Sequence, residues 1–273
     1  MPGQASILFV LLFSTASSAL AQPVTERSHF QLGKAAMDAH DPAAAIAHFE
    51  QADSKDARAW LAVALMMESR SPSDRYVERA FDAAARARAD HPEAVRSRAD
   101  LAAALHPGDM VITFLLGESH AYAWAFDRDT LIGYPVPPSA EIATAVARVN
   151  AYVAQKDRAG VQRIADDLMP ALLGPVVDRI PALTRVICVM DGPLRQLSIG
   201  ELPIGEASSS LDAQLAVSTV DDGALLDEIG RAPSKPQSQQ SAWPMTTLVA
   251  GAIIVGTLLV AGVAALRRRS SIA

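Results

Sequence analysis

One short segment, residues 185–203 (RVICVMDGPLRQLSIGELP), constrains the fold of this chain more than any other. It opens with an apolar run rich in β-branched residues that is too short for a helix, which is typical of a strand buried on both faces. The strand stops at Asp191-Gly192-Pro193, because glycine accepts positive φ and proline offers no N–H to a sheet. Helices must then cover the faces, so we expect a layered α/β domain. The residues of the strand are Val186, Ile187, Cys188, Val189 and Met190.

The residues on either side of this strand supply further elements of such a domain. Two strand-like runs, 111–116 and 121–126, are joined by Gly117-Glu118-Ser119-His120, and a third run covers 130–134, which predicts an antiparallel meander. Apolar residues at helical spacing predict helices over 139–155 and 159–173, with Pro170 kinking or dividing the second. Residues 214–220 predict one more strand, and residues 221–230 predict one short helix.

Residues 28–105 have a repeating helical pattern instead. Five positions fall at the spacing of a tetratricopeptide repeat, in which small residues let paired helices approach and an aromatic fills the space between them: Leu32, Gly33, Ala45, Phe49 and Ala52. Asp41 and Pro42 mark a helix start. A second, looser repeat and a final helix over 92–104 follow. Such a stack either binds a partner in its groove or has only a structural role as a helical support.

Three phrases of the sequence resemble the N-terminal half of CHAT domains, the caspase-like domains of bacterial proteins that usually follow tetratricopeptide repeats. They are "GDMVITFLLGESHAYAWAFDRDTLIGYPVPPSAEI" from Gly108, "LLGP" from Leu172 and "DGPLRQLSIGEL" from Asp191. The resemblance implies a partial caspase-like α/β domain over residues 108–230, preceded by the tetratricopeptide-like array over residues 28–105.

The catalytic dyad of that family is missing. The family places its histidine and cysteine downstream of the DGPL segment, whereas all six histidines precede this segment and Cys188 is the one cysteine. Cys188 lies within the apolar strand, so we interpret it as a buried thiol rather than a nucleophile. The sequence Gly117-Glu118-Ser119-His120-Ala121 joins strand to strand, unlike a nucleophile elbow, which joins strand to helix. We therefore predict no catalytic residues.

Other classes of ligand are also disfavoured. The histidines lack the spacing of a metal site, and no glycine-rich phosphate loop is present, so we predict no metal and no cofactor. A net charge of -6 argues against a nucleic-acid partner, which requires clustered Lys and Arg.

The two ends of the chain predict export and membrane attachment. Residues 1–21 end in an A-x-A pattern and are typical of a signal peptide, although an uncleaved anchor or a different start stays open. The run from Met245 to Leu266 is long and apolar enough to span a bilayer, with a buried core helix or a cleaved sorting signal as alternatives. A Pro/Ser/Gln-rich tether covers residues 231–242. The positive-inside rule then places the bulk outside the cytoplasm, in a single-pass type I topology, with residues 267–273 inside, including Arg267, Arg268 and Arg269.

These patterns favour a membrane-anchored, catalytically empty protein-interaction or scaffold module that faces the periplasm or cell exterior. We expect the partner to bind the helical repeats or the sheet edge near Val186–Met190. Alternatively, the chain is the non-catalytic half of a split caspase-like cysteine peptidase that a partner chain completes at this edge. A third hypothesis is that the chain is the remnant of a functional protein and has no specific partner.

Overall fold

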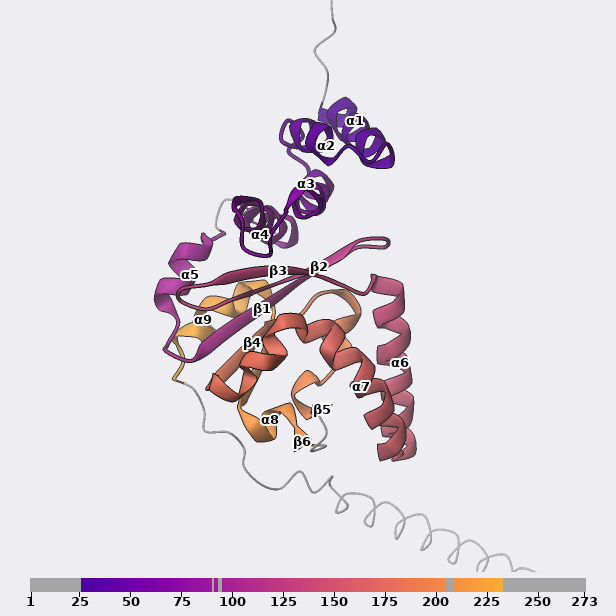
Figure 1. Cartoon of the computed structure of the whole chain (residues 1–273), viewed down its shortest axis with the longest axis vertical. Helices are drawn as coiled ribbons and strands as arrows, with labels where there is room; N and C mark the ends of the chain where they lie inside the picture. The colour runs from indigo at the N-terminus through magenta and orange to yellow at the C-terminus, as the bar shows by residue number, and fades with distance from the viewer. Residues whose placement is uncertain (1–25, 90, 93–94, 205–208, 233–273) are drawn as a thin grey trace, which may run out of the picture. The chain divides into compact units, whose positions relative to one another are not determined.

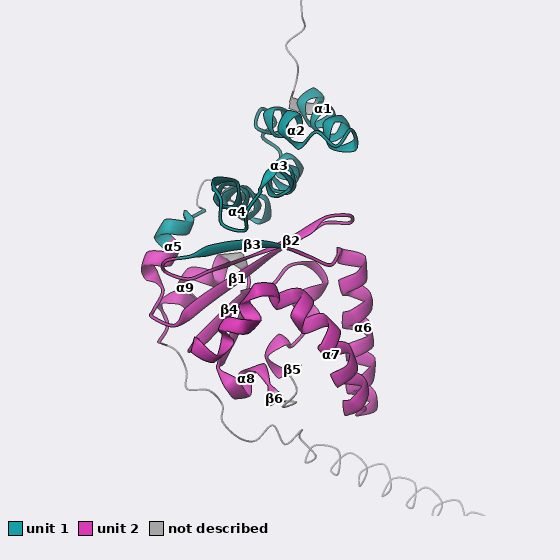
Figure 2. Cartoon of the chain, viewed as in Figure 1, with its two compact units in different colours: residues 1–100, 130–134 teal, residues 101–129, 135–273 magenta. Residues whose placement is uncertain are grey.

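The computed structural model describes residues 26–89, 91–92, 95–204 and 209–232. Contacts divide the chain into two compact units, Met1–Asp100 with Thr130–Tyr134, and Leu101–Asp129 with Pro135–Ala273 (Figure 2). The predicted signal peptide, membrane span, basic tail and all of the tether after residue 232 lie outside the described residues. Among the helices that are described, none combines the length and the apolar character that crossing a bilayer requires.

The first unit is built from helices that pack in sequence order, each against the next. The helices are α1 (Glu26–Asp38), α2 (Pro42–Phe49), α3 (Lys55–Glu68) and α4 (Arg75–Arg88). Polar side chains fix three of their starts, because each accepts a hydrogen bond from a free N–H of the first turn. These capping residues are Asp41, as predicted, together with Ser54 and Asp74.

Close packing between α1 and α2 depends on a glycine. A Cβ atom added to Gly33 would lie 2.5 Å from the ring of Phe49, so only glycine lets the ring approach this closely. The Phe49 ring is buried and also neighbours Phe30 and Trp60, with centroid distances of 6.0 and 6.3 Å. The expected meeting of a small residue with the Phe is therefore confirmed at Gly33, whereas membership in the tetratricopeptide family stays a prediction.

Residues 130–134 group with these helices. The N–H of Gly133 donates to the carbonyl of Pro72 at 2.8 Å. Because Gly133 has no side chain, Met66 and Val77 pack directly against its backbone. Residues 131–134 of this segment belong to a strand, β3 (Leu131–Val136).

Parallel and antiparallel strands form a five-stranded sheet in the order β3-β2-β1-β4-β7, and all of its strands except most of β3 belong to the second unit. Its other strands are β1 (Asp109–Leu116), β2 (Ala121–Phe126), β4 (Arg185–Val189) and β7 (Ala216–Val220). The antiparallel pairing of β1 with β2 confirms that part of the predicted meander, and β4 runs parallel to both β1 and β7. The expectation of an α/β domain is thus confirmed.

Helices lie on both faces of this sheet. The long pair α6 (Ser139–Gln155) and α7 (Arg158–Leu173) packs together, and α7 passes in front of the sheet in Figure 1, whereas α9 (Leu225–Gly230) lies behind it. Pro170 does not divide α7, which continues to Leu173. The short elements that remain are η2 (Gly174–Ala182), η3 (Gly192–Gln196), η4 (Ile199–Glu201), β5 (Pro203–Ile204), β6 (Ser209–Ser210), α8 (Leu211–Gln214) and η5 (Asp222–Ala224).

One predicted helix starts at the wrong residue. The final helix of the repeats, expected over 92–104, is α5 (Arg98–Ala104). Ser97 explains the later start, because its hydroxyl accepts from the N–H of Asp100 at 3.2 Å and donates to the Asp100 carboxylate at 2.9 Å. This reciprocal capping fixes the first turn at Ser97 rather than at Pro92.

Candidate protein-binding edge

The strand expected to offer a sheet edge lies in the interior of the sheet. Every residue of β4 pairs with β1 on one side and with β7 on the other, and Val186, Ile187, Cys188, Val189 and Met190 are all buried. The prediction of an edge at Val186–Met190 is therefore wrong. The reason is that β7 matches β4 along its full length, from Arg185 opposite Ala216 to Val189 opposite Val220.

On this side of the sheet the edge strand is β7 instead. In the part of the chain that the structure describes, no strand pairs with its outer side. Ala216 donates to the carbonyl of Thr184 at 3.2 Å, and the carbonyl of Val220 accepts from Met190 at 3.1 Å, so residues 216, 218 and 220 direct their backbone groups at β4. Backbone direction alternates along a strand, and Val217 and Thr219 therefore direct theirs outward.

This edge lacks two features that often protect edge strands from pairing. Its sequence, AVSTV, contains no charged residue and no proline, and its side chains are exposed or half-buried. An outward row of backbone donors and acceptors without such protection is a template for a further strand. The geometry of β7 therefore suits the binding of an extended polypeptide.

A hollow of about 420 Å³ lies beside this edge. The α9 side chains Asp227 and Glu228 line it together with Arg231, which follows the helix, and β7 contributes Ser218 to Val220. The hollow leaves room for the side chains of an added strand, and its charged side chains come from α9 and the residue that follows it.

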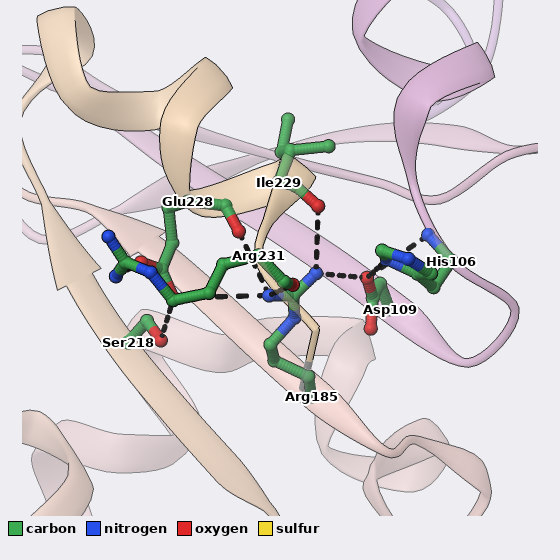
Figure 3. Close-up of polar contacts among 7 residues, drawn as sticks. All are labelled: His106, Asp109, Arg185, Ser218, Glu228, Ile229 and Arg231. Atoms are coloured by element: carbon green, nitrogen blue, oxygen red, sulfur yellow. Dashed lines mark hydrogen bonds and ion pairs between the residues drawn. The ribbon is translucent and has the colours of Figure 1, made fainter. Parts of the chain in front are cut away.

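A buried ionic cluster holds α9 to the sheet behind this edge (Figure 3). The side chain of Arg185 is 1% exposed and pairs with the buried carboxylate of Asp109. Its Nη1 donates to the carbonyls of Glu228 at 2.9 Å and Arg231 at 2.8 Å, and its Nη2 donates to that of Ile229 at 3.3 Å. A planar guanidinium thus satisfies three carbonyls at the carboxyl end of a helix.

Further contacts complete the cluster. The carboxylate of Glu228 accepts from the hydroxyl of Ser218 at 2.6 Å and pairs with Arg231 (Figure 3). Asp109 also accepts from the N–H of His106 at 3.1 Å. Because Arg185 and Asp109 are buried and paired with each other, we assign the cluster a structural role: it fixes α9, and with it the wall of the hollow. Sequence reasoning missed this cluster, although a charged residue opening each of the apolar strands β1 and β4 was a visible signal.

Charged residues also lie at the carboxyl ends of the parallel strands, where ligands bind in many open α/β sheets. The carboxylate of Asp191 accepts from the N–H of Leu116 at 2.9 Å and so ties the end of β1 to the residues after β4. Arg195 lies 3.6 Å from Asp221 in an exposed ion pair. Asp191 is thus committed to the fold, and Arg195 to an ion pair at the surface.

The residues considered for catalysis remain apart. Cys188 is 0% exposed, and burial raises the pKa of its thiol to about 12, as expected of a structural cysteine. The Ser119 hydroxyl lies 2.9 Å from Nδ1 of His120, but both belong to the turn between β1 and β2, as the sequence predicted. No group of three potential metal ligands occurs within the described ranges.

The helical unit has a hollow of its own, of about 300 Å³, between α2, α3 and α4. Basic and acidic side chains alternate around it, and carboxylates neutralise two of its arginines, since Arg58 pairs with Asp53 and Arg79 pairs with Glu50. Desolvation raises the pKa of Asp82, which lines the hollow, whereas the charge of Arg86 opposes the shift. The hollow therefore offers no uniform charge to a ligand, and β7 remains the stronger candidate.

No family model matches this chain, and no curated protein matches it either.

Proposed function

We propose that this chain is a protein-interaction module without catalytic chemistry, in which the outer edge of β7 receives an extended segment of another polypeptide. The observation that carries the proposal is the uncharged edge strand, with Val217 and Thr219 directing backbone groups outward beside an open hollow. The sequence resemblance to the N-terminal half of CHAT domains is in keeping with a sheet that continues beyond this edge. The apolar run at 245–266 supports attachment to a membrane, with the module outside the cytoplasm.

Site-specific photo-crosslinking of the full chain in membranes tests this proposal. A benzophenone amino acid replaces Thr219 at the edge or, as the control, Val153, which is 40% exposed on α6. We expect adducts with a polypeptide from position 219 and none from position 153. Equal labelling from both positions would contradict a specific edge.

A second pair of variants separates backbone pairing from simple proximity. Val217→Pro removes an outward N–H, whereas Val217→Ala keeps it, and an edge strand tolerates proline where the N–H faces away from the sheet. We expect the proline variant alone to lose the adduct. Hydrogen exchange in β4 should stay slow in both variants, which shows that the sheet is intact.

The same edge suits the alternative of a split peptidase, because a partner that pairs with β7 would extend the sheet beyond β4. An adduct partner that carries a Cys/His peptidase segment, together with peptide hydrolysis only in the assembled pair, favours this alternative over a scaffold. A partner without such a segment excludes it.

A further inference from the structure

We infer that the segment received by β7 is short and carries a lysine or arginine opposite Ser218. The side chain of that residue enters the hollow beside the edge and pairs with Asp227. The inference rests on the proposed function, because it names the chemistry of the partner of the same edge. Three observations carry it: the backbone groups that β7 leaves open, the face on which the hollow lies, and the charges that line the hollow.

The open stretch of the β7 edge is short. Val217 and Thr219 direct their N–H and C=O groups outward. On either side of them the backbone is already engaged, because the N–H of Leu215 and the carbonyl of Asp221 form hydrogen bonds within the chain, at 3.1 and 3.0 Å. An added strand therefore gains only about four main-chain hydrogen bonds, and its side chains must supply the selectivity.

The hollow lies on one face of this edge. The Ser218 hydroxyl donates to Glu228 on α9 at 2.6 Å, so Ser218 projects from the face that α9 covers. A residue directly opposite Ser218 on an added strand projects from the same face, because paired residues of neighbouring strands share a face. The hollow of about 420 Å³ lies there, lined by Ser218 and by α9. The position opposite Ser218 is central to the short pairing and is therefore the one that selects a side chain.

The charged side chains of the hollow leave a negative charge after pairing. Glu228 and Arg231 pair with each other, so their charges cancel. Asp227 also lines the hollow, and among the residues that the structure describes no ion pair or hydrogen bond engages its carboxylate. A cationic side chain in the hollow meets this carboxylate, whereas an anionic one meets a like charge, which is unfavourable. The hollow therefore favours lysine or arginine.

The opposite face of the edge supplies a matched control. Val217 projects there, since a Cβ atom added to Gly200 of η4 would lie 3.3 Å from the Val217 side chain. Glu201, also of η4, is exposed, as is Asp227. Replacement of either carboxylate by lysine changes the net charge equally, but only the change at Asp227 lies in the hollow.

Photo-crosslinking of the full chain in detergent to synthetic peptides tests the inference. A benzophenone amino acid replaces Thr219, whose side chain projects away from the hollow because side chains alternate along a strand. The probes are the acetylated peptides SVTKTVS, SVTQTVS and SVTETVS, which are palindromes and so present the same central residue in either strand direction. We expect the lysine peptide to give about threefold more adduct than the glutamine peptide, and the glutamate peptide to give the least.

Charge variants of the chain then identify the side chain that selects the peptide. Asp227→Lys should reverse the order, so that the glutamate peptide gives the most adduct, whereas Glu201→Lys should preserve it. Slow hydrogen exchange in β4 shows that the sheet is intact in both variants. Equal yields from the three peptides, an order that Asp227→Lys leaves unchanged, or no adduct with any peptide would overturn the inference.

The outcomes distinguish this inference from the proposed function. Adducts from Thr219 in membranes, together with peptide yields that do not depend on charge, would overturn the basic segment and leave β7 as the binding edge. The absence of adducts both in membranes and with all three peptides would overturn the two proposals together.

Discussion

Replacement of Arg185 by leucine should unfold the α/β unit more readily than any change at its surface. Arg185→Leu keeps much of the side-chain volume but leaves the carboxylate of Asp109, which is 0% exposed, without its cation. It also leaves the carbonyls of Glu228, Ile229 and Arg231 without a donor. Breaking a buried pair by removing one partner costs about 3–5 kcal/mol, a large fraction of the roughly 5–15 kcal/mol that stabilises a domain.

Thermal and urea unfolding of the full chain measure this loss, with hydrogen exchange in α9 as a local readout. We expect a decrease in Tm of roughly 10–20 °C for a unit of this size and rapid exchange of the amides of α9. The matched control is Arg195→Leu, because Arg195 forms an ion pair with Asp221 in which both side chains are more than half exposed. Such exposed pairs contribute less than about 1 kcal/mol.

A double variant identifies the source of the loss. Asp109→Asn combined with Arg185→Leu removes the buried charge, so the double variant should be more stable than Arg185→Leu alone. If Arg185→Leu destabilises the unit no more than Arg195→Leu does, or if the added Asp109→Asn lowers stability further, the reasoning about the cluster is refuted.

Three further predictions concern single groups. Burial raises the pKa of Cys188 from 9.0 to about 12, so the free energy of unfolding should fall as pH rises from 9 to 12, and alkaline urea titrations should show less of this slope in Cys188→Ala. Desolvation raises the pKa of Asp82, so its contribution to stability is greatest below pH 3.8 and is lost as pH rises through the folded pKa. Asp82→Asn should therefore stabilise the helical unit at pH 7 in thermal unfolding; a loss would contradict this. Gly33→Ala should destabilise the helical unit by about 1–2 kcal/mol because its Cβ meets the Phe49 ring, and the smaller side chain in Gly33→Ala/Phe49→Leu should recover part of this loss in urea.

Features that depend on neighbouring residues were predictable from the sequence. The start of α2 at Asp41 and Pro42 follows from local capping, and the strand at 186–190 follows from a short apolar run closed by a turn. The burial of Cys188 follows from its place within that run. Each signal acts within a few residues, so the pattern alone was sufficient.

Features that depend on distant residues were not predictable in the same way. The strand signal at 214–220 allowed pairing with β4 but did not specify that it extends along the whole strand, so the edge lies one strand further out than predicted. The Arg185 cluster joins residues 76 and 43 positions apart, and no local pattern specifies such a meeting. The sequence therefore predicted that the sheet has an open edge, but it placed that edge at the wrong strand.

The hydrogen bonds from Arg185 to the carbonyl groups at the end of α9 have a mechanical consequence. Arg231 is the second-last residue that the structure describes, and its carbonyl is one of the three that Arg185 binds. A pull applied at this residue therefore acts on a buried guanidinium in the central strand β4 through the Arg231 carbonyl, and on β7 through the Arg231–Glu228 pair and the Ser218 hydroxyl. Tension would thus be shared between the middle of the sheet and its outer strand.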